Sequence, residues 1–286
     1  MMKKRICLLL ALIMLFSVFA AGCGGNDDAA NDANDVNQDG EAAGDTSLTD
    51  VQDKGELILG LDDSFPPMGY RDENGDIVGF DIDVATAVCE VLGVELKLQP
   101  IDWKSKEMEL NTGNIDCIWN GMSVSVEREE QMSLSIPYLD NHMALVVMPD
   151  SGISTVADMQ GKNLAVQTGS TAEEALEAED GAELKAAVAN VNGFDDNLAA
   201  LMDLESGASD AVLIDDVVAN YLIATSGKNM IVLEDFLYAE NYAIGFRKED
   251  AALTEAVNTA LRTLKDSGKL AEIATKWFGS DTTIVE

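Results

Sequence analysis

The sequence is poor in the residues that hold metal ions and build disulfide frameworks. It contains one histidine, His142, and four cysteines. Cys7 and Cys23 lie within or just after an apolar run near the N-terminus, so only Cys89 and Cys117 remain for the folded part. A disulfide-dense scaffold is therefore excluded, and a single histidine without a cluster of Cys or His gives no metal site. We expect Cys89 and Cys117 to be buried free thiols and His142 to be an ordinary exposed residue.

Basic residues are also scarce. The chain has 18 lysine and arginine residues against 52 aspartate and glutamate residues, which gives a formal net charge of −34 at pH 7. This charge argues against nucleic acid as a partner and against binding flat on an anionic membrane. Solubility is the simplest reason for the acidity.

The sequence lacks an apolar run long enough to cross a membrane. Residues 3–5 are basic, residues 6–21 are apolar except for Ser17, and small residues precede Cys23. This order is typical of an export signal, and the apolar run is shorter than the ~20 residues of a spanning helix. We predict a lipoprotein signal peptide over residues 1–22 and a lipid on Cys23 that attaches the protein outside the cytoplasm. Ordinary secretion, with Cys23 merely near the cleavage site, is the alternative.

Residues 23–50 lack aromatic residues and have hardly any branched apolar ones. They are mainly Gly, Asn, Asp, Ala and Gln. Such a segment cannot form a core, and its acidic residues repel one another and keep the chain extended. We predict an acidic flexible linker over residues 23–50 that holds a folded domain away from the lipid surface.

The remaining chain alternates between strand and helix patterns. Residues 57–59 predict a buried strand, the Asn74-Gly75 pair a hairpin turn, and residues 85–92 a helix that Gly93 ends. Further strands are predicted at residues 94–98, 115–119, 143–148, 164–166, 211–214 and 242–246, and further helices at 107–111, 171–178, 197–204 and 253–264. This alternation predicts an α/β fold with a largely parallel sheet, whose ligands collect at the carboxyl ends of the strands.

Three motifs carry candidate chemistry at these strand ends. Ser170 starts a predicted helix and Glu173 follows three residues later, which predicts a capping box whose neighbouring backbone amides suit a carboxylate. Arg128 follows a predicted strand and can hold a carboxylate by two parallel hydrogen bonds. Asp215 ends a buried strand, where its charge suits an ammonium group. Each motif also has a structural interpretation, namely helix capping for Ser170 and Asp215 and a solvated ion pair for Arg128.

Six segments, in the same order and at similar spacing, resemble the polar amino-acid solute-binding proteins of ABC importers, the extracellular solute-binding protein family 3. The resemblance spans about residues 55–279, and the segments are residues 62–68, 79–83, 120–128, 161–171, 210–215 and 276–279. It implies an α/β, periplasmic-binding-protein-like fold of type II, in which two α/β lobes are joined by two hinge strands. The first lobe would comprise residues 51–142 and 240–286, and the second lobe residues 143–239.

The resemblance also implies where the ligand binds. Gly121, Ser123, Arg128 and the amide of Thr171 stand where family members hold the α-carboxylate, and Asp215 stands where they hold the α-ammonium group. By position, Phe65 and Trp103 would form the aromatic walls of the site. Asp62, Asn120 and Gln167 stand where family members contact the ligand side chain. A cationic ligand side chain could pair with Asp62.

The function that the resemblance implies is capture of a polar L-amino acid and its delivery to a membrane permease. We expect a monomer that is attached to the membrane through its lipid only, of the Gram-positive type, and that needs no cofactor. The resemblance implies that other subunits hydrolyse ATP, so this chain needs no nucleotide site, and it has no phosphate-loop motif. Two alternatives stay open. One is an enzyme similar to the cyclohexadienyl dehydratases, for which no triad of nucleophile, base and orienting group can be assembled. The other is a sensor module, which the absence of an added domain before Glu286 disfavours.

Overall fold

The computed structural model describes residues 44–179 and 181–286. The predicted signal peptide, Cys23 and most of the predicted linker lie outside the described residues. Within the described part of the chain, none of the helices has the length and apolar character needed to span a bilayer.

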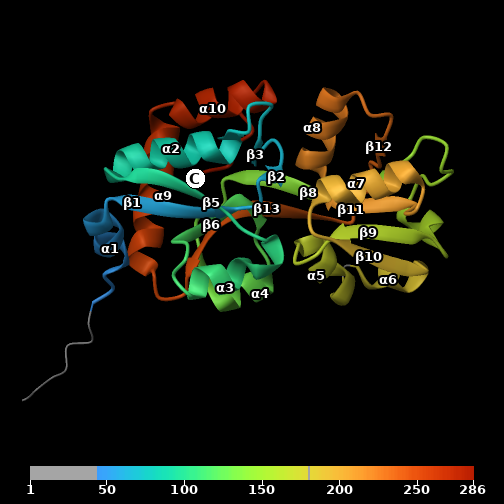
Figure 1. Cartoon of the computed structure of the whole chain (residues 1–286), viewed down its shortest axis with the longest axis horizontal. Coiled ribbons are helices and arrows are strands. Elements are labelled where there is room, and N and C mark those ends of the chain that lie inside the picture. The colour runs from blue at the N-terminus through green and yellow to red at the C-terminus, as the bar shows by residue number, and fades with distance from the viewer. Residues whose placement is uncertain (1–43, 180) are drawn as a thin grey trace, which may run out of the picture. The chain divides into compact units, whose positions relative to one another are not determined.

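One large sheet runs through the described part of the chain (Figure 1). Its strands are, in spatial order, β10 (Asn190–Phe194), β9 (Asn163–Gln167), β11 (Ala211–Asp215), β8 (Leu139–Val147), β13 (Tyr238–Arg247), β6 (Cys117–Ser123), β1 (Glu56–Leu61) and β5 (Glu95–Pro100). Two short strands join its middle, β12 (Ile231–Val232) on β8 and β7 (Met132–Leu134) on β13. A small second sheet comprises β2 (Ser64–Phe65), β3 (Gly69–Arg71) and β4 (Ile77–Val78).

The large sheet is mixed, so the prediction of a largely parallel sheet is wrong for its middle. The pairs β1–β5, β1–β6, β9–β10 and β9–β11 are parallel. In contrast, β8 pairs antiparallel with β11 and with β13, and β13 pairs antiparallel with β6. The reason is topological, because the two middle strands carry the chain to and from one half of the sheet in opposite directions.

The registers show that β8 and β13 each belong to both halves of the sheet. Residues 139–143 of β8 pair with β13, and residues 143–147 pair with β11. Residues 238–242 of β13 pair with β8, and the rest of the strand pairs with β6 and β7. This arrangement agrees with a two-lobe fold in which two strands form the hinge. The predicted lobe boundaries fall inside these two strands and stay a prediction.

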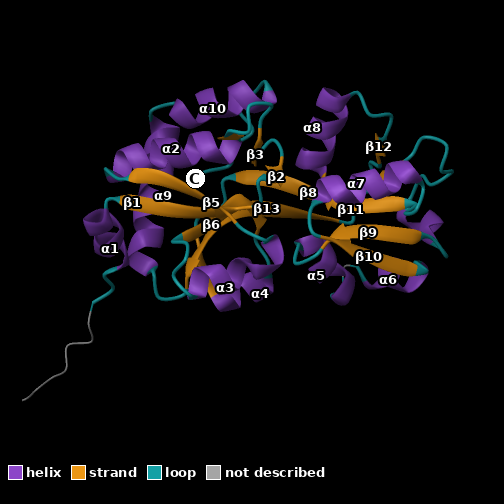
Figure 2. Ribbon diagram, viewed as in Figure 1, coloured by secondary structure: helices purple, strands orange, loops and turns teal. Residues whose placement is uncertain are grey.

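Helices cover both faces of the sheet in the first lobe, the half that contains β1, β5 and β6 (Figure 2). Leu57, Leu59 and Leu61 of β1 lie in the same buried cluster as residues of α2, α9 and α10, whereas Ile58 packs with the cluster that contains Leu110 of α3. The alternation along β1 thus buries both faces. The helices of this lobe are α1 (Ser47–Lys54), α2 (Phe80–Leu92), α3 (Lys106–Asn111), α4 (Val126–Gln131), α9 (Ala251–Asp266) and α10 (Lys269–Phe278).

The second lobe repeats this layering around β9, β10 and β11. Leu164 and Val166 of β9 pack in one cluster with residues of α5 and α6, and Ala165 packs in another with residues of α7 and α8. The helices of this lobe are α5 (Thr171–Glu177), α6 (Ala182–Ala187), α7 (Asn197–Ser206) and α8 (Asp216–Ser226).

Several local predictions are confirmed. Gly93 ends α2 in a left-handed conformation with φ of 74°, and Gly75 lies in the turn between β3 and β4 with φ of 87°. Cys89 and Cys117 are buried and free.

Two local predictions differ from the structure. Residues 47–50, which the sequence assigns to the acidic linker, are the first half of α1, because Ser47 and Val51 are buried and Ser47 Oγ accepts from the backbone of α9. His142 is half-buried rather than exposed. Its ring stacks on Phe236 with centroids 4.6 Å apart and lies 3.2 Å from a carboxylate oxygen of Asp216.

Candidate functional site

Strand β6 and helix α4 carry four of the predicted binding residues. Asn120, Gly121 and Ser123 lie within β6, whereas the sequence predicts a strand that ends at residue 119 and a loop after it. The strand continues because Ser123 pairs with Tyr242 of β13. Arg128 follows in α4, so that one strand and one helix position all four residues.

Gly121 occupies a position that only glycine fits. Its φ is 58°, in the left-handed region, and a Cβ atom there would lie 2.7 Å from Cε1 of Phe65 and 3.1 Å from Cε2 of Tyr242. Its backbone N–H donates to Oδ2 of the buried Asp81 at 2.7 Å. The backbone of β6 is thereby held against Phe65, the residue predicted to form an aromatic wall.

Arg128 is nearly completely buried and already holds a carboxylate. Nη1 donates to the carbonyl oxygen of Ser123 at 2.9 Å, and Nη2 donates to Oε1 of Glu174 at 2.9 Å. Nε is buried without a hydrogen-bond partner. Glu174 lies in α5 of the second lobe, and sequence reasoning missed it. The guanidinium therefore contacts both lobes, and its predicted partner, a ligand carboxylate, would share the guanidinium with Glu174.

The start of α5 is capped almost as predicted. Ser170 Oγ accepts from the N–H of Glu173 at 3.3 Å. The Glu173 carboxylate accepts from the N–H of Gly169 at 2.7 Å, one residue before the position that a capping box uses. Thr171 is the first residue of the helix and is buried, and its carbonyl oxygen accepts from the Tyr238 hydroxyl at 2.9 Å. The prediction of a capped helix start is confirmed, whereas a carboxylate at its amides stays a prediction.

Asp215 is a buried carboxylate whose partners are neutral. Oδ1 accepts from Nδ2 of Asn141 at 2.8 Å and from the hydroxyl of Tyr242 at 2.7 Å. The side chain makes no capping hydrogen bond to α8, so the capping interpretation of Asp215 is wrong. Burial, followed by the charge of the neighbouring Glu240, raises the pKa of Asp215 from 3.8 to about 7.

The register of the middle strands brings Asp215 close to two polar residues of the hinge strands, Asn141 and Glu240. Glu240 of β13 is opposite Asn141 of β8, and Nδ2 of Asn141 donates to Oε1 of Glu240 at 2.6 Å as well as to Asp215. The hydroxyl of Ser123 in β6 donates to the same oxygen of Glu240. Asp215, Asn141, Glu240 and Ser123 thus form a continuous chain of hydrogen bonds across β11, β8, β13 and β6, which we call the hinge network. Sequence reasoning missed Asn141 and Glu240, because nothing in the sequence gives the register that pairs them.

Asp62 and Gln167 meet across the two lobes. Nε2 of Gln167 donates to Oδ2 of Asp62 at 2.7 Å, and the N–H of Ser64 donates to Oδ1 at 2.9 Å. Neither partner is a cation, and burial raises the pKa of Asp62 from 3.8 to about 6. Oε1 of Gln167 accepts from Nδ2 of Asn197 at 3.2 Å. Gln167 therefore holds Asp62 in place.

Asn120 is the predicted side-chain contact with the most unmet hydrogen-bonding capacity. It is only 1% exposed, and both Oδ1 and Nδ2 are buried without a hydrogen-bond partner. Buried amides in folded proteins nearly always have partners, because an unpaired polar group costs free energy. A polar ligand group at this position would satisfy both atoms.

Trp103 is buried and lies beside a lysine that sequence reasoning missed. Lys106 Nζ is 5.2 Å from the centroid of the Trp103 ring. The same ammonium group donates to the carbonyl oxygen of Gly169 in the second lobe at 2.8 Å and pairs with Glu107 at 2.8 Å. Lys106 therefore lies between the Trp103 ring and the loop that precedes Thr171.

Comparisons with known proteins agree with the fold. Residues 57–280 match the model of the family described as bacterial extracellular solute-binding proteins, family 3. The chain is 30% identical over 238 residues to the L-cystine-binding protein TcyJ of Escherichia coli K12, covering 82% of this chain and 87% of TcyJ. It is 32% identical over 241 residues to the arginine-binding extracellular protein ArtP of Bacillus subtilis, covering 83% of this chain and 91% of ArtP.

A solved structure shares more of the sequence. It is an ABC uptake transporter substrate-binding protein from Streptococcus pneumoniae with bound histidine, which is 41% identical to this chain. The alignment covers 84% of this chain and 98% of that protein, with a TM-score of 0.81. At this identity the likeness extends beyond the fold to the family.

We predict that Gly121→Ala destabilises the protein by about 1–3 kcal/mol, because alanine is strained at a φ of 58° and its Cβ would clash with the Phe65 ring. Chemical denaturation followed by circular dichroism measures this change. Gly113→Ala is the matched control, since Gly113 has a φ of 77° but open space around a Cβ atom. Equal losses in the two variants would mean that the backbone conformation, and not contact with Phe65, requires glycine at position 121.

We predict that the ligand-free protein becomes more stable as the pH falls from about 8 to about 5.5. Burial raises the pKa values of Asp62 to about 6 and of Asp81 and Asp215 to about 7, against 3.8 for an ordinary aspartate, so the folded state takes up protons that the unfolded state does not. The stabilisation is fully present below 3.8, the pKa in the unfolded state, decreases as the pH rises above it, and is lost above the folded-state values of 6–7. Thermal unfolding across this range tests it, and Asp215→Asn should flatten the curve. A variant with the slope of the original protein would contradict the assignment to Asp215.

Proposed function

The chain belongs to family 3 of the bacterial extracellular solute-binding proteins, and we propose that it captures a polar L-amino acid between its two lobes and delivers it to an ABC importer. The relatives named above bind cystine, arginine or histidine. Binding without catalysis is the simplest function, because the named relatives are binding proteins. The charged groups of the site are also better explained by the charges of an amino acid than by acid–base catalysis.

The observation that carries the proposal is the buried Asp215 carboxylate without a cationic partner, in the same hydrogen-bonded arrangement as Arg128. A free amino acid presents one carboxylate and one ammonium group at a fixed separation. Asp215 supplies a carboxylate for the ammonium group, and Arg128 supplies a guanidinium with an unpaired Nε. Charge-assisted hydrogen bonds of this kind are roughly twice as strong as neutral ones.

Asp62 and Asn120 favour a ligand with a polar and preferably cationic side chain. Asp62 is buried with only neutral partners, and Asn120 is buried with none for its side chain. A side chain that carries a positive charge and hydrogen-bond donors would neutralise the first and satisfy the second. Phe65 and Trp103 suit this role as apolar walls for the rest of the side chain.

The remaining features follow from the proposed function. The protein acts as a monomer outside the cytoplasm, and a lipid on Cys23 keeps it at the membrane close to its permease. The acidic residues after Cys23 serve as the spacer. ATP is hydrolysed by other subunits, so this chain needs no cofactor.

We expect calorimetric titration of the purified protein, freed of bound ligand by unfolding and refolding, to detect one or a few polar L-amino acids among the common ones and cystine. Arg128→Ala and Asp215→Asn should each weaken that binding by about 100-fold or more, because each leaves a charged ligand group buried without its partner. The matched controls are Arg262→Ala and Asp216→Asn, which remove the same charges from an exposed helix position and from the residue next to Asp215. Binding of no amino acid would refute the function, whereas original affinity in either site variant would refute only the assignment of that residue.

A second titration tests the preference for a cationic side chain. Asp62→Asn should weaken the binding of arginine, lysine or ornithine by about tenfold or more, because a charge-assisted bond is lost, and should change the binding of neutral amino acids little. Asp63→Asn removes the same charge from the neighbouring residue, which pairs with the exposed Arg71. Equal effects on cationic and neutral ligands would contradict a pairing with Asp62.

A further inference from the structure

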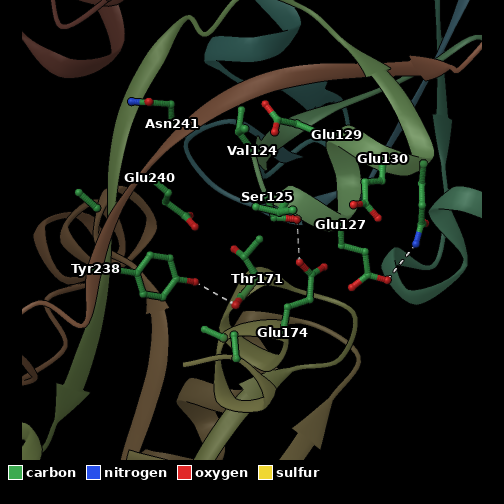
Figure 3. A pocket seen from close by; sticks show the side chains of 15 residues that line it. Val124, Ser125, Glu127, Glu129, Glu130, Thr171, Glu174, Tyr238, Glu240 and Asn241 are labelled. Atoms are coloured by element: carbon green, nitrogen blue, oxygen red, sulfur yellow. Dashed lines mark hydrogen bonds between the residues drawn. The ribbon is translucent and has the colours of Figure 1, made fainter. Parts of the chain in front are cut away.

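A groove of about 850 Å³ lies beside the predicted amino-acid site (Figure 3). One wall is α4 of the first lobe, the other is α5 of the second lobe, and residues 238–241 of β13 form the floor. The groove shares Thr171 with the predicted site, but Asp62, Phe65, Trp103, Arg128 and Asp215 do not line it.

The groove is lined by carboxylates from both lobes and from the hinge. The five glutamates are Glu127, Glu129, Glu130, Glu174 and Glu240, and no lysine or arginine is among the lining residues. In a chain of net charge −34, acidic residues on a surface are expected, so the four glutamates of the walls would not by themselves indicate a ligand.

Glu240 distinguishes this groove from an acidic surface. Its side chain is 9% exposed, Oε1 accepts from Ser123 and Asn141, and Oε2 is buried without a hydrogen-bond partner. In Figure 3 the carboxylate is turned away from the strand and into the groove, toward Thr171. Burial raises the pKa of Glu240, because the charged form has lost its contact with water. A buried carboxylate oxygen with no partner calls for a positively charged donor.

The spacing of the carboxylates indicates an extended cation rather than a metal ion. Among the described residues, no group of three His, Cys, Asp or Glu side chains is close enough to hold a metal ion. Between the glutamates, the groove is lined by apolar surface from Val124, Val126, Ala175, Ala239 and the ring of Tyr238. Positive charges separated by methylene groups match this alternation, because the methylene groups pack on the apolar surface while each ammonium group meets a carboxylate.

We infer that this groove binds a linear di- or polyamine, with one ammonium group on Oε2 of Glu240 and the others along the glutamates of α4, because Glu174 of α5 already pairs with Arg128. The inference does not depend on the proposed capture of an amino acid. Because the walls belong to different lobes, a bound polyamine bridges the lobes beside the hinge.

Calorimetric titration of the protein with spermidine tests this inference, in about 150 mM salt to screen the general attraction between a polycation and an acidic protein. We expect saturable binding of one spermidine. Glu240→Gln should weaken it by about tenfold or more, because the charge-assisted bond is lost while the amide oxygen can still accept from Ser123 and Asn141. The matched control, Glu272→Gln, removes the same charge from the exposed face of α10 and should leave spermidine binding unchanged.

A second variant and a competition titration distinguish binding in the groove from binding in the amino-acid site or along the acidic surface. Ala178 lines the groove at the C-terminal end of α5 and is exposed. Ala178→Trp narrows the groove without changing its charge, so it should also weaken spermidine binding by about tenfold or more; thermal unfolding verifies that both variants are folded. Equal affinity in Glu240→Gln and Glu272→Gln would overturn the inference, as would original affinity in Ala178→Trp. Competition between spermidine and a bound amino acid, instead of simultaneous binding, would place spermidine in the amino-acid site and would overturn it too.

Discussion

The hinge network is the interaction on which the rest of the site depends. Asp215, Asn141, Glu240 and Ser123 lie on four neighbouring strands, and two of these strands, β8 and β13, connect the lobes. A single amide, Nδ2 of Asn141, donates to two carboxylates at 2.8 and 2.6 Å. Two carboxylates that share a neutral donor repel each other when both are charged. The hinge network therefore lacks a positive charge that would offset this repulsion. The positions of Asp215 and Ser123, which the proposed ligand would contact, are both fixed by this chain of bonds.

The balance of buried charges explains which ligand charges the fold accommodates. The two buried cations of the site already have anionic partners, since Arg128 pairs with Glu174 and Lys106 pairs with Glu107. The buried carboxylates of Asp62 and Asp215 have only neutral donors, and Glu240 accepts only from a hydroxyl and an amide. Burial of such groups is unfavourable unless a cation compensates it or a proton is taken up. A ligand with more positive than negative charge would therefore gain more from this site than a neutral one.

The sequence predicts local structure well and long-range pairing poorly. The features that were predicted correctly follow from signals within a few residues of one another. They are helix α2 with its end at Gly93, strand β1, the cap at Ser170 and each of the family segments. Asn141 and Glu240 are 99 residues apart and meet only because β8 and β13 pair antiparallel in one register, which no local pattern specifies. The same reason explains the error in β6, where pairing with β13 extends the strand through Asn120, Gly121 and Ser123.

Direct contacts between the lobes set what a ligand has to supply. Gln167 binds Asp62, Arg128 binds Glu174, and Lys106 donates to the carbonyl oxygen of Gly169, each bond crossing from one lobe to the other. A ligand shifts the equilibrium between open and closed lobes only by the difference in its affinity for the two states. Contacts that form without the ligand reduce the free energy that the ligand must provide for closure. Glu174 has the opposite effect on one bond, because its carboxylate occupies the same guanidinium that a ligand carboxylate would use. The affinity for an amino acid thus depends on how far the contacts between the lobes favour closure and how far Glu174 competes with the ligand carboxylate for Arg128. Glu174 contributes to both, because its bond to Arg128 is itself a contact between the lobes.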